Sequence, residues 1–113
     1  MREIKFRAWF ITHKRMFSSY EFMGMSGFVD FLKNKTIFPM QFTGLLDKNG
    51  KEIWEGDIVC MEDGGSYGFK HEVLFKQGMF CVEDDGTWFP IGQFYSVTEV
   101  IGNIYNNPEL LEK

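Results

Sequence analysis

The stretch QFTGLLDKNGKEIWEGDIV, residues 41–59, carries the clearest local pattern of this 113-residue chain and decides how its fold is interpreted. Its carboxylates crowd around a glycine, which is a composition that suits a calcium loop as well as a β-hairpin. An EF-hand loop that began at Asp47 would require glycine at its sixth position and glutamate at its twelfth. Glu52 and Ile58 occupy those positions, so the calcium interpretation fails.

A hairpin accounts for the same residues. Asn49-Gly50 is a dipeptide that supplies the positive φ of a tight turn between two strands. Lys48 and Lys51 alternate with the acids, which predicts a solvated hairpin tip that includes Asp47. Glu55-Gly56 then bends the chain into a further strand, DIVCM. The stretch therefore predicts a hairpin that leads into a small β-structure.

Length and composition indicate a single compact domain, residues 1–113, with ample core material. Aromatic residues make up 18% of the chain, and thirteen of them are Phe. The two cysteines, Cys60 and Cys81, form no CxxC pair, and charged residues interrupt the N-terminal stretch where a secretory leader would be apolar. No apolar run approaches the ~20 residues that a membrane span needs. These features predict a cytoplasmic protein with free thiols and no membrane partner.

The net charge of −4 conceals a strong asymmetry along the chain. Residues 1–41 carry seven Lys/Arg against three Asp/Glu, a net of +4, whereas residues 42–113 carry five against thirteen, a net of −8, and the two sum to −4. Such a division can steer charged partners or favour head-to-tail contact between copies of the chain. An ordinary solvated surface is the alternative interpretation.

The N-terminal part predicts a β-meander and one short helix. REIKFRAWF, residues 2–10, alternates between apolar and polar side chains with the period of a half-buried strand. ITHK follows as a turn, and RMFSSYEFM, residues 15–23, reads as a second strand. SGFVDFLKNK, residues 26–35, places apolar side chains at helical spacing behind a serine that can cap, which predicts the helix.

From residue 37 onward the pattern is mostly β. EDGGSYG, residues 62–68, reads as a loop, and turns are expected at Gln77-Gly78 and at Asp85-Gly86. Several short strands separated by such turns predict an SH3-like small barrel in the C-terminal part. The fold class is therefore mainly β, with subdomains at residues 1–53 and 54–113. The second subdomain ends in a short helical turn.

No pattern in the sequence supports catalysis, a metal or a cofactor. The soft ligands His13, Cys60, His71 and Cys81 are scattered without the paired spacing of zinc sites. A cysteine nucleophile would need a histidine and an orienting group, and no local motif supplies them. The carboxylates at residues 62–63 and 83–85 fall at predicted turns, where burial for acid–base work is not expected.

One face of the first strand is the candidate binding site. Lys5, Arg7 and Trp9 project together, and basic side chains beside an aromatic ring suit nucleic-acid backbones and bases. The alternative is that Trp9 packs against the next hairpin while the two cations are solvated. The overall acidic balance weighs against nucleic acid.

Three blocks of the sequence resemble the YopX family, small proteins found in bacteriophages and prophages. They are REIKFRAW at residues 2–9, QFTGLLDKNGKEIWEGDIV at 41–59 and EVIGNIYNNPELL at 99–111. The sequence departs from the family pattern at AWF, residues 8–10, where an acidic residue after the tryptophan is common. The resemblance implies a largely β fold and a phage or prophage origin in a bacterial host cell, and it carries no established reaction. The shared residues form a structural signature: Gln41, Thr43, Gly44, Asn49, Gly50, Glu55, Gly56, Asp57, Gly102, Asn107 and Pro108.

The sequence and the resemblance together favour a non-enzymatic module that binds another protein or assembles with copies of itself. A nucleic-acid-associated phage factor, with contacts through Lys5, Arg7 and Trp9, is the first alternative. An acidic decoy of a basic host protein is the second.

Overall fold

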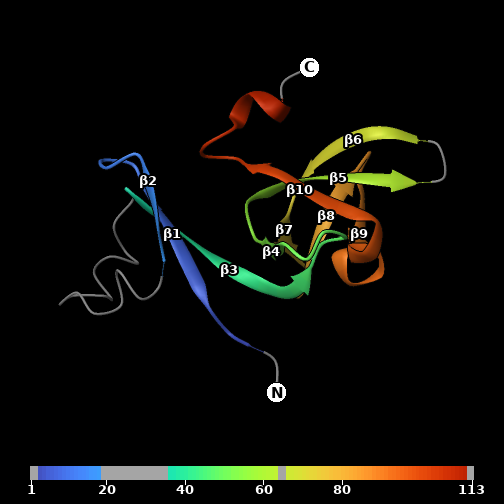
Figure 1. Cartoon of the computed structure of the whole chain (residues 1–113), viewed down its shortest axis with the longest axis horizontal. Coiled ribbons are helices and arrows are strands. Elements are labelled where there is room, and N and C mark those ends of the chain that lie inside the picture. The colour runs from blue at the N-terminus through green and yellow to red at the C-terminus, as the bar shows by residue number, and fades with distance from the viewer. Residues whose placement is uncertain (1–2, 19–35, 64–65, 112–113) are drawn as a thin grey trace. The chain divides into compact units, whose positions relative to one another are not determined.

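A computed structural model describes residues 3–18, 36–63 and 66–111 (Figure 1). The helix expected at residues 26–35 and the end of the second strand, residues 19–23, lie outside the described residues. The chain divides into two compact units, residues 1–42 and 43–113. This boundary falls before the 47–51 hairpin, whereas the sequence placed the subdomain boundary after it, at residue 53.

The unit boundary coincides with the charge asymmetry. Residue 42 is an uncharged phenylalanine, so the N-terminal unit has the net charge of +4 counted for residues 1–41, and the C-terminal unit has the −8 of the remainder. The two signs of charge are therefore separated between two compact units as well as along the sequence.

The N-terminal unit is built on an antiparallel meander. Strand β1 (Phe6–Phe10) pairs with β2 (Arg15–Ser18) on one edge and with the first half of β3 (Ile37–Leu46) on the other. A turn over residues 11–14 joins β1 to β2, as expected. One face of the meander buries a small apolar cluster made of Ala8, Phe10, Phe17 and Ile37. The alternation predicted for the first strand therefore holds for Ala8 and Phe10, while Phe6 is exposed.

The C-terminal unit begins with the second half of β3, which pairs with β4 (Glu52–Trp54). Two three-stranded antiparallel sheets follow (Figure 1). The first has the order β10-β5-β6 and consists of β10 (Thr98–Asn103), β5 (Asp57–Asp63) and β6 (Ser66–Glu72). The second has the order β7-β8-β9 and consists of β7 (Leu74–Lys76), β8 (Met79–Asp84) and β9 (Thr87–Pro90).

A single buried residue separates the two sheets along the chain. Val73 lies between β6 and β7, donates its N–H to the Asp57 carbonyl at 2.8 Å and accepts the Gly56 N–H at 2.9 Å. Because its backbone is committed to the bend before β5, the segment HEVLF cannot continue as the one strand that the sequence suggests. Val73 also belongs to the main core, which contains Ile53, Val59, Val73, Val82, Ile91 and Val100, with Leu45 and Phe89 packed against it.

Short connections complete the unit. The 3-10 helices η1 (Ile91–Gln93) and η2 (Tyr95–Val97) join β9 to β10, and the expected terminal helical turn is η3 (Pro108–Leu111), which lies against β6. Strand β5 runs to Asp63 and β6 begins at Ser66, so most of the loop expected at residues 62–68 is strand instead.

The predicted turns of the second sheet are confirmed. Gln77 and Gly78 have φ values of 53° and 74°, and Asp85 and Gly86 have values of 51° and 81°. Positive φ at both central residues is the mark of a type I′ turn, whose twist matches that of the flanking strands. The mainly β fold class is likewise confirmed, while closure of the two sheets into an SH3-like barrel stays a prediction.

Candidate functional site

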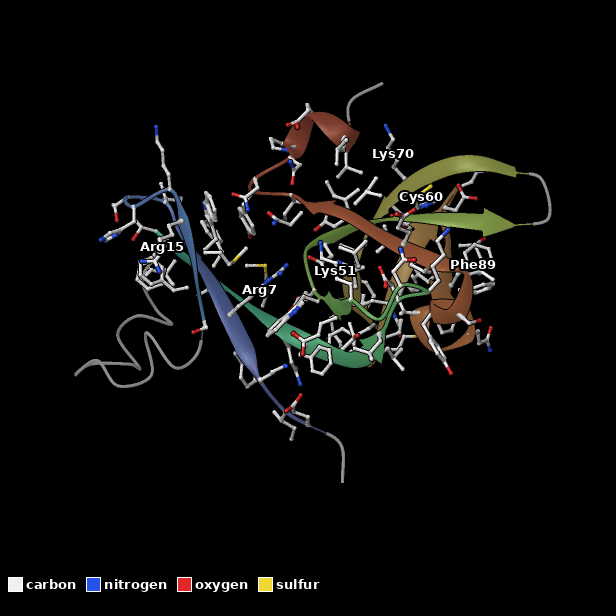
Figure 2. All side chains as sticks on the ribbon, viewed as in Figure 1. Arg7, Arg15, Lys51, Cys60, Lys70 and Phe89 are labelled. Carbon is white, nitrogen blue, oxygen red and sulfur yellow. The ribbon has the colours of Figure 1, made fainter. Side chains whose placement is uncertain are left out.

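Arg7 and Trp9 lie two residues apart on β1, and therefore on one face of the meander, as the sequence predicted. Both are half-buried, and Figure 2 shows Arg7 on this strand. Lys5 precedes the strand; its ammonium lies 3.2 Å from a Glu3 carboxylate oxygen and 4.7 Å from the centroid of the Phe42 ring. The three residues are near neighbours, but they do not form an open cationic surface.

Apolar residues surround that face. Across the strand pairs, Met40 stands opposite Arg7, while Phe38 and Met16 stand on either side of Trp9. Residues directly opposite each other in antiparallel strands share a face and interact. Trp9 is thus flanked by apolar cross-strand neighbours, which is the packed arrangement named as the alternative to binding.

A second group of basic residues is more exposed, and the sequence places its first two members in a predicted turn and Arg15 in the following strand. His13, Lys14 and Arg15 are consecutive at the end of the β1–β2 hairpin, and all three are exposed. We call these three residues the basic tip. The imidazole of His13 meets the rings of Phe10 and Phe17 edge to face, with centroids 5.8 and 5.6 Å away. The signal that reveals it is a run of three basic residues that spans the end of the predicted turn and the start of the second predicted strand.

Arg15 packs with the two phenylalanines beneath the basic tip. The Phe10 and Phe17 ring centroids are 4.4 Å apart, and the Arg15 guanidinium carbon lies 4.2 Å from the Phe17 centroid. A cation over an aromatic face is held by the ring quadrupole. The charges of the tip are therefore mounted on a packed aromatic cluster.

Asp47 is the residue that sequence reasoning placed most wrongly. It was expected at a solvated tip, but its side chain is 6% exposed. One carboxylate oxygen accepts the N–H groups of Asn49 and Lys51, at 2.8 and 2.9 Å, and the other accepts the Val100 N–H at 2.9 Å. The carboxylate therefore closes the hairpin and also fastens it to β10.

The ionisation of Asp47 follows from these contacts. Burial by itself raises the pKa of the carboxyl group, but the hydrogen bonds from Val100, Lys51 and Asn49 outweigh burial, so the pKa is lowered below its ordinary value. Asp47 is a structural anion, and its oxygens are directed at backbone donors.

Other signature residues have local structural contacts. The Asp57 carboxylate, also buried, accepts the Trp54 N–H at 2.8 Å. The Thr43 hydroxyl donates to the Ile53 carbonyl at 2.7 Å and accepts the Leu45 N–H at 3.2 Å. These hydrogen bonds fix the β3–β4 pair and the bend into β5.

Three signature glycines have positive φ. The values at Gly44, Gly50 and Gly56 are 88°, 81° and 86°. Asn49 keeps a negative φ, so the 47–51 hairpin is turned by Gly50 alone. Of the remaining signature residues, Gln41 lies half-buried on β3 and Glu55 half-buried in the bend before β5.

The last signature residues form a compact turn after β10. Asn107 immediately precedes η3, and its carbonyl accepts the Leu110 N–H at 3.1 Å. Its side-chain oxygen accepts the Asn103 N–H at 3.2 Å. The Asn103 side chain accepts the N–H groups of Tyr105 and Asn106. A Cβ atom on Gly102 would come within 2.5 Å of the Asn107 side-chain oxygen, so any other residue there would have to displace the Asn107 side chain.

Further interactions between ionisable residues lie in the C-terminal unit. Burial, together with the nearby Glu55 carboxylate, raises the pKa of Glu72, and Lys76 acts in the opposite sense. His71 and Asp84 approach to 3.8 Å. Within the described residues no group of three or more His, Cys, Asp or Glu side chains is arranged to hold a metal ion. The thiols of Cys60 and Cys81 are free.

The β8–β9 hairpin carries the opposite charge to the basic tip. Glu83, Asp84 and Asp85 are consecutive and exposed, and Trp88 stands directly opposite Glu83 in the strand pair. We call these four residues the acidic hairpin. Trp88 is 38% exposed, so the hairpin presents a carboxylate and an aromatic ring side by side.

Large apolar side chains are exposed elsewhere in the C-terminal unit as well. Phe75 is 50% exposed and packs against the half-buried Phe80 with ring centroids 5.0 Å apart, and Tyr95 is 42% exposed. No helix in the described ranges is both long enough and apolar enough to cross a membrane.

Comparison with known proteins connects the chain to a family. The sequence model described as YopX protein matches residues 5–112. The structure is similar to protein EF1440 from Enterococcus faecalis, with 27% identity, a TM-score of 0.66, and coverage of 99% of this chain and 100% of that one. It is also similar in fold to protein yopX from Bacillus subtilis, with 23% identity, a TM-score of 0.65, and coverage of 96% and 98%. No curated protein matches the chain.

Proposed function

Since the chain belongs to the YopX family, we propose that it is a non-enzymatic protein-binding or assembly module of a phage or prophage, acting in the cytoplasm of the bacterial host. It works by surface contact with another protein or with copies of itself. The observation that carries this proposal is the exposure of three aromatic side chains of the C-terminal unit, Phe75, Trp88 and Tyr95. Aromatic residues are the type that protein interfaces favour at their centres.

The use of the buried carboxylates supports a role without catalysis. An acid–base catalyst at neutral pH needs a pKa near the working pH and an oxygen that can reach a substrate. Asp47 has a lowered pKa, and both of its oxygens accept backbone N–H groups. Asp57 likewise accepts a backbone N–H at the bend into β5. These two buried acids stabilise the fold.

Site-specific photo-crosslinking tests the binding function. A benzoylphenylalanine placed at position 88 reports on the exposed indole site, and the same group at position 70 is the matched control on an exposed polar position of β6 (Figure 2). We expect a discrete crosslinked product in host cells at position 88, which excess unmodified protein removes by competition. Equal, diffuse crosslinking at both positions would argue against a binding surface there.

A nucleic-acid-associated function is the second candidate, and the net charge of +4 on the N-terminal unit favours it. Lys5, Arg7 and Trp9 would supply the contact. Retention on DNA that weakens steeply with salt, and weakens further in Arg7→Ala, is the outcome expected of this candidate, because released counterions make such binding salt-dependent.

An acidic decoy of a basic host protein is the third candidate, favoured by the net charge of −8 on the C-terminal unit. The acidic hairpin would then imitate an anionic surface. Competition between this chain and DNA for one basic host protein is the result expected of a decoy.

A further inference from the structure

The N-terminal unit carries a net positive charge and the C-terminal unit a net negative charge. The N-terminal unit of one copy can therefore attract the C-terminal unit of a second copy. A long-range attraction is weak at physiological salt, because the Debye length is about 8 Å. The contact therefore has to bring specific charged side chains close together. Among the described residues, the basic tip is an exposed run of basic side chains in the N-terminal unit, and Glu83, Asp84 and Asp85 are an exposed run of carboxylates on a hairpin of the C-terminal unit.

The basic tip is held by a closed turn and by ring contacts. The turn that carries it is closed by the Lys14 N–H, which donates to the Ile11 carbonyl at 3.2 Å, and Lys14 itself has a φ of 49°. Ring contacts anchor the residues on both sides, since His13 meets Phe17 edge to face and Arg15 lies over the same ring. Ile11, which is 46% exposed, adds an apolar contact beside the cations.

The acidic hairpin offers the complementary chemistry. Its type I′ turn at Asp85-Gly86 holds the end of the hairpin in one conformation. Glu83 and Trp88 are cross-strand partners on one face of the sheet, so a bound cation meets a carboxylate and an indole together. An arginine or lysine side chain gains an ion pair from the first and a cation–π contact from the second.

We propose that the basic tip of one copy binds the acidic hairpin of a second copy. This inference rests on the proposed assembly function and names its partner and its surfaces. The two surfaces differ from each other, so the contact is heterologous, and repetition of it leads to a closed ring or to an open chain of copies.

Charge reversal at each surface tests this contact. The variant K14D/R15E reverses the basic tip, and Asp suits the positive φ at position 14. The variant E83K/D84K reverses the acidic hairpin and keeps Asp85 for its turn. K70E reverses an exposed cation of the C-terminal unit (Figure 2) and is the control for the first variant. E109K reverses an exposed carboxylate of the same unit and is the control for the second.

Sedimentation velocity of the full-length variants, separately and mixed, gives the readout. We expect the wild type to self-associate at 150 mM salt. Each reversed variant should self-associate with an affinity at least about tenfold lower, while the controls keep the wild-type affinity. A mixture of K14D/R15E with E83K/D84K should form a complex, since an acidic tip then faces a basic hairpin. The chain that carries all four substitutions should self-associate again, which also shows that the substitutions are compatible with folding.

Three results would overturn the contact: a monomeric wild type, association that the reversed variants share with their controls, or reversed variants that fail to restore each other on mixing. The crosslinking result at position 88 distinguishes this failure from failure of the proposed function. If the wild type is monomeric but still crosslinks to a host protein, and excess unmodified protein removes that product, the binding function stands and the second copy is rejected as the partner. A monomer that gives no such product rejects both.

Discussion

Replacing Asp47 by asparagine is the most informative test of how the fold is held together. The substitution preserves the size of the side chain and changes one oxygen into a donating amide. The remaining oxygen can keep the N–H groups of Asn49 and Lys51, which share one carboxylate oxygen. The Val100 N–H, which bonds the other oxygen at 2.9 Å, then faces an N–H donor and loses its acceptor.

The magnitude follows from that lost contact. A hydrogen bond to a charged group contributes about 1.5–3 kcal/mol, and a buried donor left without an acceptor costs about 1–3 kcal/mol. The two effects overlap, so we expect Asp47→Asn to lower the free energy of unfolding by about 2–4 kcal/mol. That is a large share of the ~5–15 kcal/mol that stabilises a typical domain.

Urea denaturation followed by circular dichroism measures this change. Asp85→Asn is the matched control, because it makes the same chemical change at an exposed residue whose φ of 51° asparagine adopts readily. We expect the control to stay within about 0.5 kcal/mol of the wild type. Equal free energies of unfolding for the two variants would refute the role given to Asp47.

The pH dependence supplies an independent check. The folded-state pKa of Asp47 lies below its ordinary value of 3.8, so the carboxylate contributes stability that is fully present above that value. The contribution is lost as pH falls through the lower, folded-state pKa. The difference in unfolding free energy between wild type and Asp47→Asn should therefore be constant near neutral pH and shrink in acid below about 3.8. A difference that persists in strong acid would contradict this assignment.

Three further predictions concern the turns and the thiols. Gly50→Val should lower the unfolding free energy by more than about 1 kcal/mol, because a β-branched residue resists positive φ; an unchanged urea midpoint would contradict it. Gly102→Ala should destabilise by about 1–3 kcal/mol through its clash with Asn107, and a double-mutant cycle with Asn107→Ala should show that the cost is coupled; additive costs would contradict it. Cys60 should react with a thiol reagent in the native protein well before the buried Cys81, and equal rates would show that the core opens.

The turns of the second sheet were predictable because their information is local. Gln77-Gly78 and Asp85-Gly86 each place a residue tolerant of positive φ beside a glycine, and both adopt the expected positive values. The position of Asp47 was not predictable in this way. Its partner Val100 lies 53 residues away in the sequence, and nothing in a hairpin pattern shows which strand will lie beside it.

The candidate surfaces were likewise predictable only in part. Alternation along the strand places Arg7 and Trp9 on one face. It does not show that Met40 and Phe38 of the neighbouring strand lie opposite them. The charge asymmetry was visible in the sequence, and the unit boundary at residue 42 gives it a structural meaning. The basic tip is not evident from the sequence because HKR is divided between a predicted turn and a predicted strand. The contact between His13 and two phenylalanine rings depends on the folded hairpin.

Light scattering of the unmodified chain tests most directly whether the protein is an assembly module. At 150 mM salt we expect a molar mass above the 13.3 kDa of one chain. Near 1 M salt, where the Debye length shortens to about 3 Å, we expect a return to 13.3 kDa. A mass of 13.3 kDa at both salt concentrations across the micromolar range would contradict assembly. A larger mass that is indifferent to salt would contradict its electrostatic basis.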